Sequence, residues 1–372
     1  MQFQIKRDTL LKSLNFAHNV IERKNTLPIL SNVLLDVKGG KLSVVATDLD
    51  LVFHDEITDL KIIKDGNTTT SATVLHDLLR KLPSNLDVIF NLQDENRLSI
   101  TAESSKFNLL CLPVSNFPNF SDNFNQDGII LNKKDFLSLL NKTKISMSND
   151  ETRHYLNGIF IHTIENKGKI YLTGVATDSH RLSSSSMVME KAGDFKSFIL
   201  PKKAVFQLSN LLQDSSNEKI SLFSSDTKVQ FKTGNSQITS KIIDGKFPDY
   251  KKVVPTNNSK NLAVNVKDLI NSVERVITVS IDRKEGVKIT LDKDNIQLFV
   301  NSSSSGEGKE TLKANYNSEQ LTVSFNSRYL LDIASEIEDE IITLKLNDAV
   351  SPVLIQDNSD KHSYYVIMPM KI

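Results

Sequence analysis

The tetrapeptide Val-Ala-Thr-Asp occurs twice in this chain, at Val45–Asp48 and at Val175–Asp178, which are 130 residues apart. A second pair of motifs has the same offset, because Phe-Pro-Asn-Phe at Phe117–Phe120 is followed by Phe-Pro-Asp-Tyr at Phe247–Tyr250. Two separated motifs that share one offset indicate a structural unit that is repeated along the chain.

A third, more diverged copy extends the repeat to the whole chain. The segments that start at Phe3, Ile130 and Ala263 share an extended run, a basic residue, an aspartate and then spaced apolar residues. The aspartates are Asp8, Asp135 and Asp268. A short acceptor at a helix start binds free backbone N–H groups, so each segment predicts a strand followed by a helix that the aspartate caps.

Each copy also predicts a second helix and several strands. Apolar residues recur at helical spacing over 74–82 and 329–337, and less regularly from Pro201. Strand-like runs are separated by Lys-Gly-Gly, Asn-Lys-Gly and Thr-Gly-Asn, which are typical of hairpin turns. We therefore expect an α+β fold of three similar domains, each with two helices and an antiparallel sheet. The domains are expected at residues 1–125, 126–253 and 254–372.

The composition narrows the class of protein. Lys plus Arg and Asp plus Glu both number 45 among 372 residues, so contact with nucleic acid must use a local basic surface. Cys111 is the single cysteine, which excludes an intramolecular disulfide. The N-terminus has no apolar signal core and no apolar run approaches a membrane span. We expect a cytoplasmic protein with no membrane partner.

The second Val-Ala-Thr-Asp motif places Asp178, Ser179 and His180 side by side, which are the residue types of a hydrolase. Neighbours in an extended chain point to opposite faces, and a catalytic triad is usually assembled from separate parts of a chain. The first copy has Leu49 and Asp50 at the positions of Ser179 and His180, which favours a structural turn. The seven histidines show no metal-ligand spacing. We expect no enzyme activity, metal or cofactor.

Basic pairs recur near predicted helix starts, at Lys6–Arg7, Lys133–Lys134 and Lys202–Lys203. Any one of these pairs is explained by a helix end that lies in solvent. Cations at this end oppose the helix dipole, however, so their recurrence favours a shared surface that faces phosphates.

The C-terminus is almost free of charge. Tyr364–Met368 is expected to be a core strand, and pairing should end at Pro369, which has no N–H group. Met370 is then left for partner recognition at the surface.

Six segments, in order along the chain, carry a resemblance to a known family. They are NTLPILSNVLL from Asn25, ATDLDL from Ala46, TRHYLNGIF from Thr152, ATDSHRL from Ala176, DGKFPDYKKVVP from Asp244 and YYVIMPMKI from Tyr364. Together they resemble the bacterial DNA polymerase III beta subunit family, the DNA sliding clamps. The resemblance implies a homodimeric ring around duplex DNA, with three domains per protomer, helices lining the hole and no catalytic activity.

The resemblance also implies a pocket between the second and third domains. It would bind linear peptides of the DNA polymerase III alpha subunit, the clamp-loader delta subunit and other proteins that carry a clamp-binding motif. Matched position by position, the pocket residues are Leu156, Thr177, Ser179, His180, Arg181, Leu182, Pro248, Lys252, Val253, Pro352, Val366, Ile367, Met368, Pro369, Met370 and Lys371. The family commonly has glycine at the position of Ser179 and arginine at those of Lys252 and Lys371.

Two further sets of residues follow from the same matching. Sequence-independent contact with duplex DNA is implied for Lys24, Arg153, His154, Tyr155, Lys202 and Lys203. The dimer interface is implied at Phe107 and Leu109 of one protomer and at Thr278 and Val279 of the other. The family usually has tyrosine at the position of His154, a neutral residue at that of Asp150 and a larger aliphatic residue at that of Thr278.

Two other classes of protein stay open. A nucleic-acid-modifying enzyme needs a carboxylate cluster or a metal site, and the sequence offers neither. A protein-only scaffold would share the C-terminal pocket but would have no use for recurrent basic helix starts.

Overall fold

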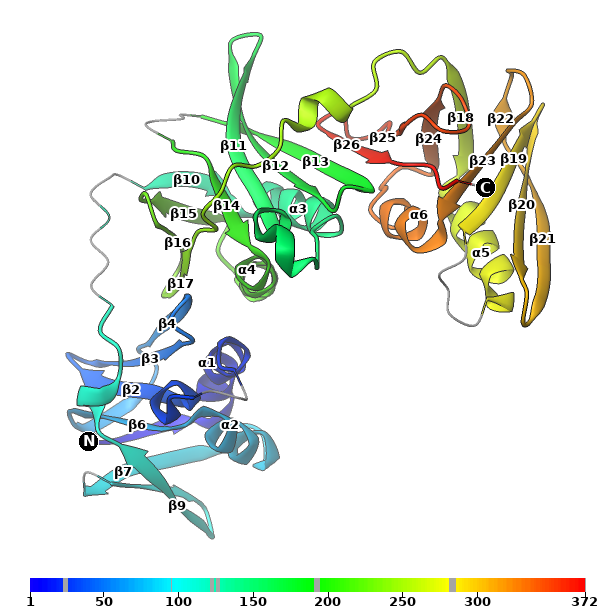
Figure 1. Cartoon of the computed structure of the whole chain (residues 1–372). Coiled ribbons are helices and arrows are strands. Elements are labelled where there is room, and N and C mark those ends of the chain that lie inside the picture. Colours follow the sequence, from blue (N-terminus) through cyan, green and yellow to red (C-terminus); the bar gives the residue numbers. More distant parts are fainter. Residues whose placement is uncertain are drawn as a thin grey trace. The chain divides into compact units, whose positions relative to one another are not determined.

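The computed structural model describes residues 1–22, 26–94, 96–120, 124, 128–190, 195–280 and 286–371. These residues form six α-helices and 26 strands, two helices for each copy of the repeat (Figure 1). The helices are α1 (Arg7–Val20), α2 (Ala72–Lys81), α3 (Lys133–Lys144), α4 (Lys202–Asp214), α5 (Val266–Val276) and α6 (Ser327–Ala334). None of the helices within these ranges is long and apolar enough to cross a membrane.

The chain divides into two compact units, which are described separately. The first consists of Met1–Leu137 and Lys203–Ile242. It holds a 13-stranded sheet, in which β4 of the first repeat pairs with β17 of the second. In sheet order the strands are β10 (Ile129–Asn132), β15 (Lys219–Ser224), β16 (Lys228–Thr233), β17 (Ser236–Lys241), β4 (Leu51–Ile57), β3 (Lys41–Thr47), β2 (Asn32–Lys38), β6 (Gly66–Ser71), β9 (Ser105–Leu112), β8 (Arg97–Ala102), β7 (Asp87–Asp94), β1 (Gln2–Lys6) and β5 (Lys61–Lys64).

The second unit consists of Ser138–Lys202 and Ile243–Ile372. Its larger sheet joins the second and third repeats, because β13 pairs with β26. The strands of this sheet are, in order, β14 (Phe198–Pro201), β11 (Gly158–Asn166), β12 (Lys169–Thr177), β13 (Arg181–Met189), β26 (Ser363–Ile367), β25 (Val353–Asp357), β24 (Ile341–Leu346), β18 (Lys260–Asn265) and β22 (Asn315–Tyr316). A four-stranded sheet follows the order β21 (Gly306–Lys313), β20 (Asn295–Ser302), β19 (Gly286–Asp292) and β23 (Leu321–Asn326).

In the first and third repeats the two helices pack against each other. In the first unit α1 lies beside α2 and covers β3 and β4 (Figure 1). Leu10, Leu14 and Ala17 recur three or four residues apart on α1 and are fully buried, which explains why this segment is helical rather than extended. In the second unit α5 lies beside α6 in the same way.

The predicted helix starts are confirmed, but the predicted caps are wrong in detail. The side chains that accept the free backbone N–H groups are Asn132, which binds Asp135 N at 3.2 Å, and Asn265, which binds Asp268 N at 3.1 Å. The aspartates lie in the first turn of each helix, as Asp8 does in α1. There their charge complements the helix dipole.

Candidate functional site

The first Thr-Asp pair builds a turn between β3 and β4. The Thr47 hydroxyl donates to the Leu51 carbonyl at 3.0 Å, and Asp48 Oδ1 accepts the backbone N–H groups of Asp50 and Leu51 at 2.9 and 2.7 Å. Leu49 has a left-handed φ of 79° and its side chain is exposed. The threonine and aspartate side chains therefore form the turn, and the side chain of Leu49 does not contribute to it.

The second Thr-Asp pair builds the same turn between β12 and β13. The Thr177 hydroxyl donates to the Arg181 carbonyl at 2.7 Å, and Asp178 Oδ1 accepts the N–H groups of His180 and Arg181 at 2.9 and 3.0 Å. Ser179 has a φ of 77°, like the leucine of the first turn. The turn expected from the repeat is confirmed. Its aspartate holds backbone groups and is not the base of a catalytic triad.

A cleft of about 220 Å³ lies beside the second turn. Its floor is apolar and its rim carries polar groups. The residues that line it are Thr177, Ser179, Arg181, Leu182, Pro248, Asp249, Tyr250, Val253, Val366 and Met368. They come from the end of β12, the turn, β13, the end of β26 with the residue after it, and the 3₁₀ helix η4 (Tyr250–Val253) with the two residues before it. Eight of these ten belong to the residue set predicted for the pocket.

Strand register explains which C-terminal residues reach the cleft. Leu182 pairs with Val366 across β13 and β26, and both are buried in one cluster with Leu156 and Tyr250. Alternate residues of a strand point to opposite faces. Ile367, which was predicted to line the pocket, lies accordingly in the core of the third repeat.

The chain leaves the sheet after β26, as predicted from Pro369. The Met368 N–H group donates to the His180 carbonyl at 2.9 Å, and the Met370 N–H group donates to the Ser324 carbonyl at 2.7 Å. The side chains of both methionines are exposed. Two backbone hydrogen bonds thus hold this apolar tail at the surface.

The other residues predicted for the pocket lie outside the lining of the cleft. Leu156 is buried beneath it. Lys252 is exposed on η4 with Nζ 3.3 Å from Asp249, and Lys371 is exposed at the end of the described chain. Pro352 precedes β25, and its carbonyl accepts a hydrogen bond from Asn258 at 2.9 Å.

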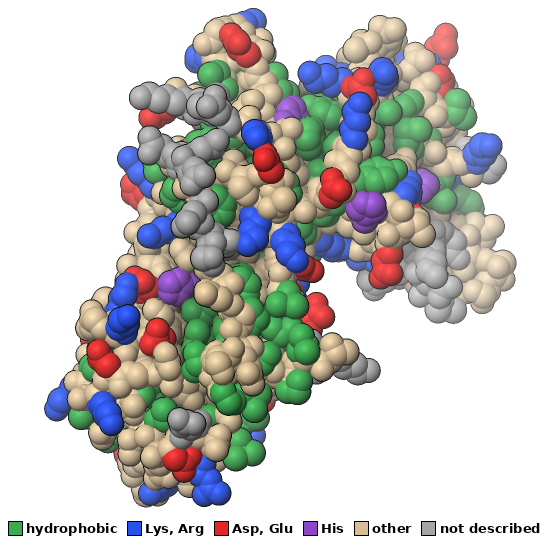
Figure 2. Space-filling model, turned by 60° about the vertical axis from the view of Figure 1, so that its left-hand side comes forward, with side chains coloured by type: hydrophobic (Ala, Val, Ile, Leu, Met, Phe, Trp, Pro, Cys, Tyr) green, Lys and Arg blue, Asp and Glu red, His purple; other side chains and the backbone are tan. Residues whose placement is uncertain are grey.

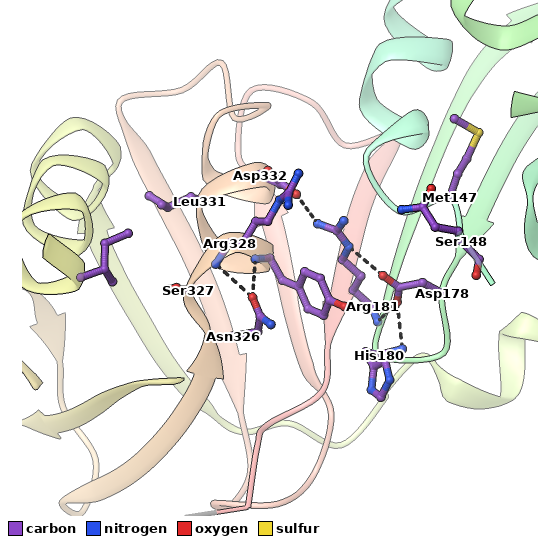
Figure 3. A pocket seen from close by; sticks show the side chains of 13 residues that line it. Met147, Ser148, Asp178, His180, Arg181, Asn326, Ser327, Arg328, Leu331 and Asp332 are labelled. Atoms are coloured by element: carbon purple, nitrogen blue, oxygen red, sulfur yellow. Dashed lines mark hydrogen bonds and ion pairs between the residues drawn. The ribbon is translucent and has the colours of Figure 1, made fainter. Parts of the chain in front are cut away.

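A second cavity, of about 730 Å³, adjoins the cleft at Arg181 (Figure 3). Arg181 is nearly buried and is held by Asp178 Oδ2 at 3.1 Å and by Asp332 Oδ2 at 2.6 Å. Its guanidinium lies over the Tyr329 ring, 4.2 Å from the centroid. His180 also lines this cavity, with its ring centroid 6.5 Å from that of Tyr329. Arg181 therefore acts as a fixed wall between the two hollows.

Sequence reasoning missed several residues of these hollows. Asp249 and Tyr250 line the cleft, and Asn326, Tyr329 and Asp332 line the cavity. Tyr250 was visible as the end of the second Phe-Pro motif. Burial raises the pKa of its phenol above the ordinary value of tyrosine.

The loop expected to contact DNA forms the 3₁₀ helix η3 (Glu151–Leu156). Arg153 donates to Asp150 Oδ2 at 2.8 Å and to Ser179 Oγ at 2.6 Å. Hydrogen bonds from Thr152 and Arg153 lower the pKa of Asp150 to about 2. His154 lies 3.1 Å from the Asp244 carbonyl through Nε2. The loop is thus tied to the turn that borders the cleft.

The two lysines at the start of α4 lie in different environments. Lys202 donates to the side-chain amide oxygen of Asn149, which precedes η3. Lys203 pairs with the carboxylates of Asp48 and, at 3.3 Å, Glu22. Lys24 lies outside the described residues. On the face shown in Figure 2, cationic and anionic side chains alternate without a large area of one sign, in agreement with the zero net charge.

The four residues expected at the dimer interface lie beside sheet edges. Phe107 and Leu109 belong to β9, whose backbone pairs with β6 only at Cys111 and Leu112 among the described residues. Phe107 is exposed. Thr278 and Val279 belong to the 3₁₀ helix η5 (Ile277–Val279), which contacts the edge strand β21.

Comparison with known proteins covers the whole length of the chain. Residues 1–121, 130–249 and 251–371 match the N-terminal, central and C-terminal domains of the DNA polymerase III beta subunit. The chain belongs to the DNA polymerase III beta subunit family. Within it, the chain is 37% identical to the beta sliding clamp of Caulobacter vibrioides over 100% of both chains, and 32% identical to that of Rickettsia felis over 99% of both.

Solved structures of the family agree with the fold. A sliding clamp from Bartonella birtlesii, crystallised with griselimycin bound, superposes with a TM-score of 0.95 at 39% identity over 100% of both chains. A clamp from Pseudomonas aeruginosa superposes with a TM-score of 0.91 at 30% identity, again over 100% of both chains. The expected α+β fold of three similar domains is confirmed. The chain is a DNA sliding clamp, a processivity factor of DNA replication without catalytic activity.

Proposed function

We propose that this clamp binds linear peptides of its partners in the cleft beside the second Thr-Asp turn. The observation that carries the proposal is the cleft itself, where Leu182 and Val366 form a buried floor and Val253 and Met368 expose apolar side chains at the edge. A concave, mostly apolar hollow with a few polar groups at its rim is the usual form of a binding site. One or two apolar side chains of a peptide would fill it, with an affinity of about micromolar.

The partners we propose are the DNA polymerase III alpha subunit, the clamp-loader delta subunit and other proteins with a clamp-binding motif. Ser179 on the rim and His180 beside it are exposed, and the side chains that shape their turn are those of Thr177 and Asp178. Their side chains are therefore available to a peptide without cost to the fold. A protein-only scaffold would use the same cleft but would not encircle DNA.

We further propose a cytoplasmic homodimer with domains 1–125, 126–253 and 254–372 in each protomer. The first domain of one protomer would meet the third domain of the other, a heterologous contact that a two-fold axis repeats and closes. The open edge of β9 beside Leu109 and the edge strand β21 beside Thr278 support this arrangement, because free strand edges can pair across an interface.

Duplex DNA would pass through the ring in contact with phosphates only, since sliding excludes a fixed base register. Arg153 and Lys202 are the described basic residues that suit such contact, because Arg153 lies in the loop and Lys202, at the start of α4, binds Asn149 just before it. His154 and Tyr155 complete the surface of that loop.

Deletion of residues 368–372 tests the cleft. We expect calorimetry to show loss of binding of a synthetic clamp-binding peptide, while light scattering gives the mass of an unchanged dimer. Deletion of Ile372 alone is the control, because it leaves Met368, Met370 and Lys371 in place and should bind normally. Unchanged peptide affinity in the longer deletion would place the site elsewhere.

Retention on DNA tests the ring. Clamp loaded by its clamp loader onto nicked circular DNA should remain bound after gel filtration and be released when a nuclease linearises the circle. A protein-only scaffold would give no retention on either form. A conventional DNA-binding protein would stay on both.

A further inference from the structure

The hydroxyl of Ser179 is not needed by the turn in which it lies. In the equivalent turn Leu49 has no hydroxyl and nevertheless adopts a φ of 79° against 77° for Ser179. A left-handed φ is unfavourable for any residue with a side chain, so the backbone gives no reason for serine here. The role of the hydroxyl must come from what it contacts.

Among the described residues, the side chain of Ser179 has one hydrogen-bond partner. Its Oγ accepts a hydrogen bond from Arg153 Nη1 at 2.6 Å, and within the described ranges its own O–H finds no acceptor. A serine hydroxyl can accept and donate at once. Because Ser179 lines the cleft, this O–H is available to a carbonyl group of a peptide that enters it.

The Arg153 side chain is bound by Asp150 of its own loop and by Ser179 of the turn. Asp150 binds its Nε at 2.8 Å and also accepts from the Thr152 backbone N–H and hydroxyl at 3.0 and 2.6 Å, so this carboxylate is fixed within the loop. The Ser179 contact is the one that joins the loop to the turn, 26 residues away along the chain. Arg153 interrupts the 3₁₀ helix with φ −114° and ψ 56°, and Asp150 is the residue within the loop that binds its side chain.

We propose that Ser179 couples the cleft to DNA contact by Arg153, so that peptide and DNA each weaken the binding of the other. The inference rests on the proposed function, which supplies the peptide in the cleft and the phosphate at the loop. A peptide carbonyl that accepts the Ser179 O–H polarises the hydroxyl and makes Oγ a better acceptor for Arg153. Arg153 is then retained at the turn. Conversely, when Arg153 moves to a phosphate, Ser179 loses the N–H donor to its Oγ, and its O–H becomes a weaker donor to the peptide carbonyl.

The coupling must be reciprocal, because linkage of two binding equilibria gives one factor for both directions. Calorimetry should measure the affinity of a synthetic clamp-binding peptide with and without a saturating short linear duplex. Fluorescence anisotropy should measure the affinity of the same duplex at low salt with and without saturating peptide. For the full-length wild-type chain we expect each ligand to weaken the other by about 3- to 10-fold, with equal factors.

Two variants of one residue identify the group responsible. Ser179→Ala and Ser179→Gly both remove the hydroxyl, but only glycine relieves the left-handed backbone. Both should bring the coupling factor close to one. Arg153→Met should do the same and also weaken the duplex. Leu49→Ala alters the equivalent turn of the first repeat and should leave the factor unchanged.

Each result decides between distinct possibilities. If peptide and duplex bind independently, or if peptide strengthens duplex binding, the coupling is refuted while the proposed function stands. If the factor persists in both Ser179 variants, another group transmits it and our assignment is overturned. If the wild-type chain does not bind the peptide at all, the proposed function fails, and the coupling fails with it.

Discussion

Lys142 Nζ lies 2.8 Å from Asp360 Oδ2 and 2.9 Å from Glu338 Oε1, and only 6% of the Lys142 side chain is exposed. Lys142 belongs to α3 of the second repeat, whereas both carboxylates belong to the third. This nearly buried ion pair therefore reinforces the junction that β13 and β26 make by strand pairing.

Replacing Lys142 with methionine should destabilise the chain by about 2–4 kcal/mol, because Asp360 is left as a largely buried carboxylate without its cation. Chemical denaturation would measure the free energy of unfolding. Lys12→Met is the matched control, since the Lys12–Asp214 pair is exposed and should be worth less than about 1 kcal/mol. Equal losses in the two variants would show that burial does not matter at this junction.

The same pair predicts how stability depends on pH. Burial would raise the pKa of Asp360, but hydrogen bonds from Lys142 and Ser363 outweigh it and hold the pKa below the ordinary 3.8. A depressed folded pKa gives stability that is complete above the unfolded value and is lost as the pH falls through the folded one. Thermal melts below about pH 4 should therefore lose stability more steeply in the wild type than in Lys142→Met. Parallel curves would exclude the pair as the cause.

The two Thr-Asp turns should respond alike to loss of their threonine hydroxyl. Thr47→Val keeps the shape of the side chain but removes the bond to the Leu51 carbonyl and the acceptor for the Leu49 N–H group. We expect about 1–3 kcal/mol of destabilisation by denaturant melts, and a similar loss for Thr177→Val. A loss confined to one turn would contradict the structural equivalence of the repeats.

Local features of the fold could be predicted from the sequence because they depend on local patterns. The helix starts, the Thr-Asp turn and the end of β26 before Pro369 follow from periodicity, side-chain acceptors and a missing N–H group. Comparison of the two repeats also showed, from the sequence alone, that the turn does not require the serine. Leu49 and Ser179 occupy the same position of the turn with unrelated side chains.

Pairs of distant side chains could not be predicted in this way. Arg181 meets Asp332 across 151 positions, Lys203 meets Asp48 across 155, and Lys142 meets Asp360 across 218. Such contacts depend on the register of strands that join different repeats, which no local pattern specifies. Matching to the family had placed Ile367 in the pocket, whereas its register on β26 turns it into the core.

Leu109→Asp should dissociate the proposed dimer. A carboxylate at the centre of an apolar interface would be buried without a partner, at a cost of several kcal/mol. Light scattering should give the mass of one chain at low micromolar concentration, where the wild type gives the mass of two. Ile63→Asp, at an exposed position of β5 in the same domain, should stay dimeric. A dimeric Leu109→Asp protein would place the interface elsewhere.

Lys202 and Lys203 are adjacent, but their replacement by alanine should have different effects on DNA binding. Within the described ranges the Lys202 ammonium is bound only to a neutral amide, so it can turn to a phosphate at little cost, whereas Lys203 is neutralised by Asp48 and Glu22. Lys202→Ala should reduce the slope of log affinity against log salt by about 0.9, equally for any duplex sequence. Lys203→Ala should change that slope less and should reduce stability instead, because it leaves the nearly buried carboxylate of Asp48 without its cation.

Anisotropy over a salt series and a thermal melt of each variant would separate the effect on DNA binding from the effect on stability. A Lys203→Ala variant that keeps its stability but loses the larger part of the salt slope would show that Lys203, and not Lys202, contacts phosphate. Loss of binding to one duplex sequence alone would be incompatible with sliding.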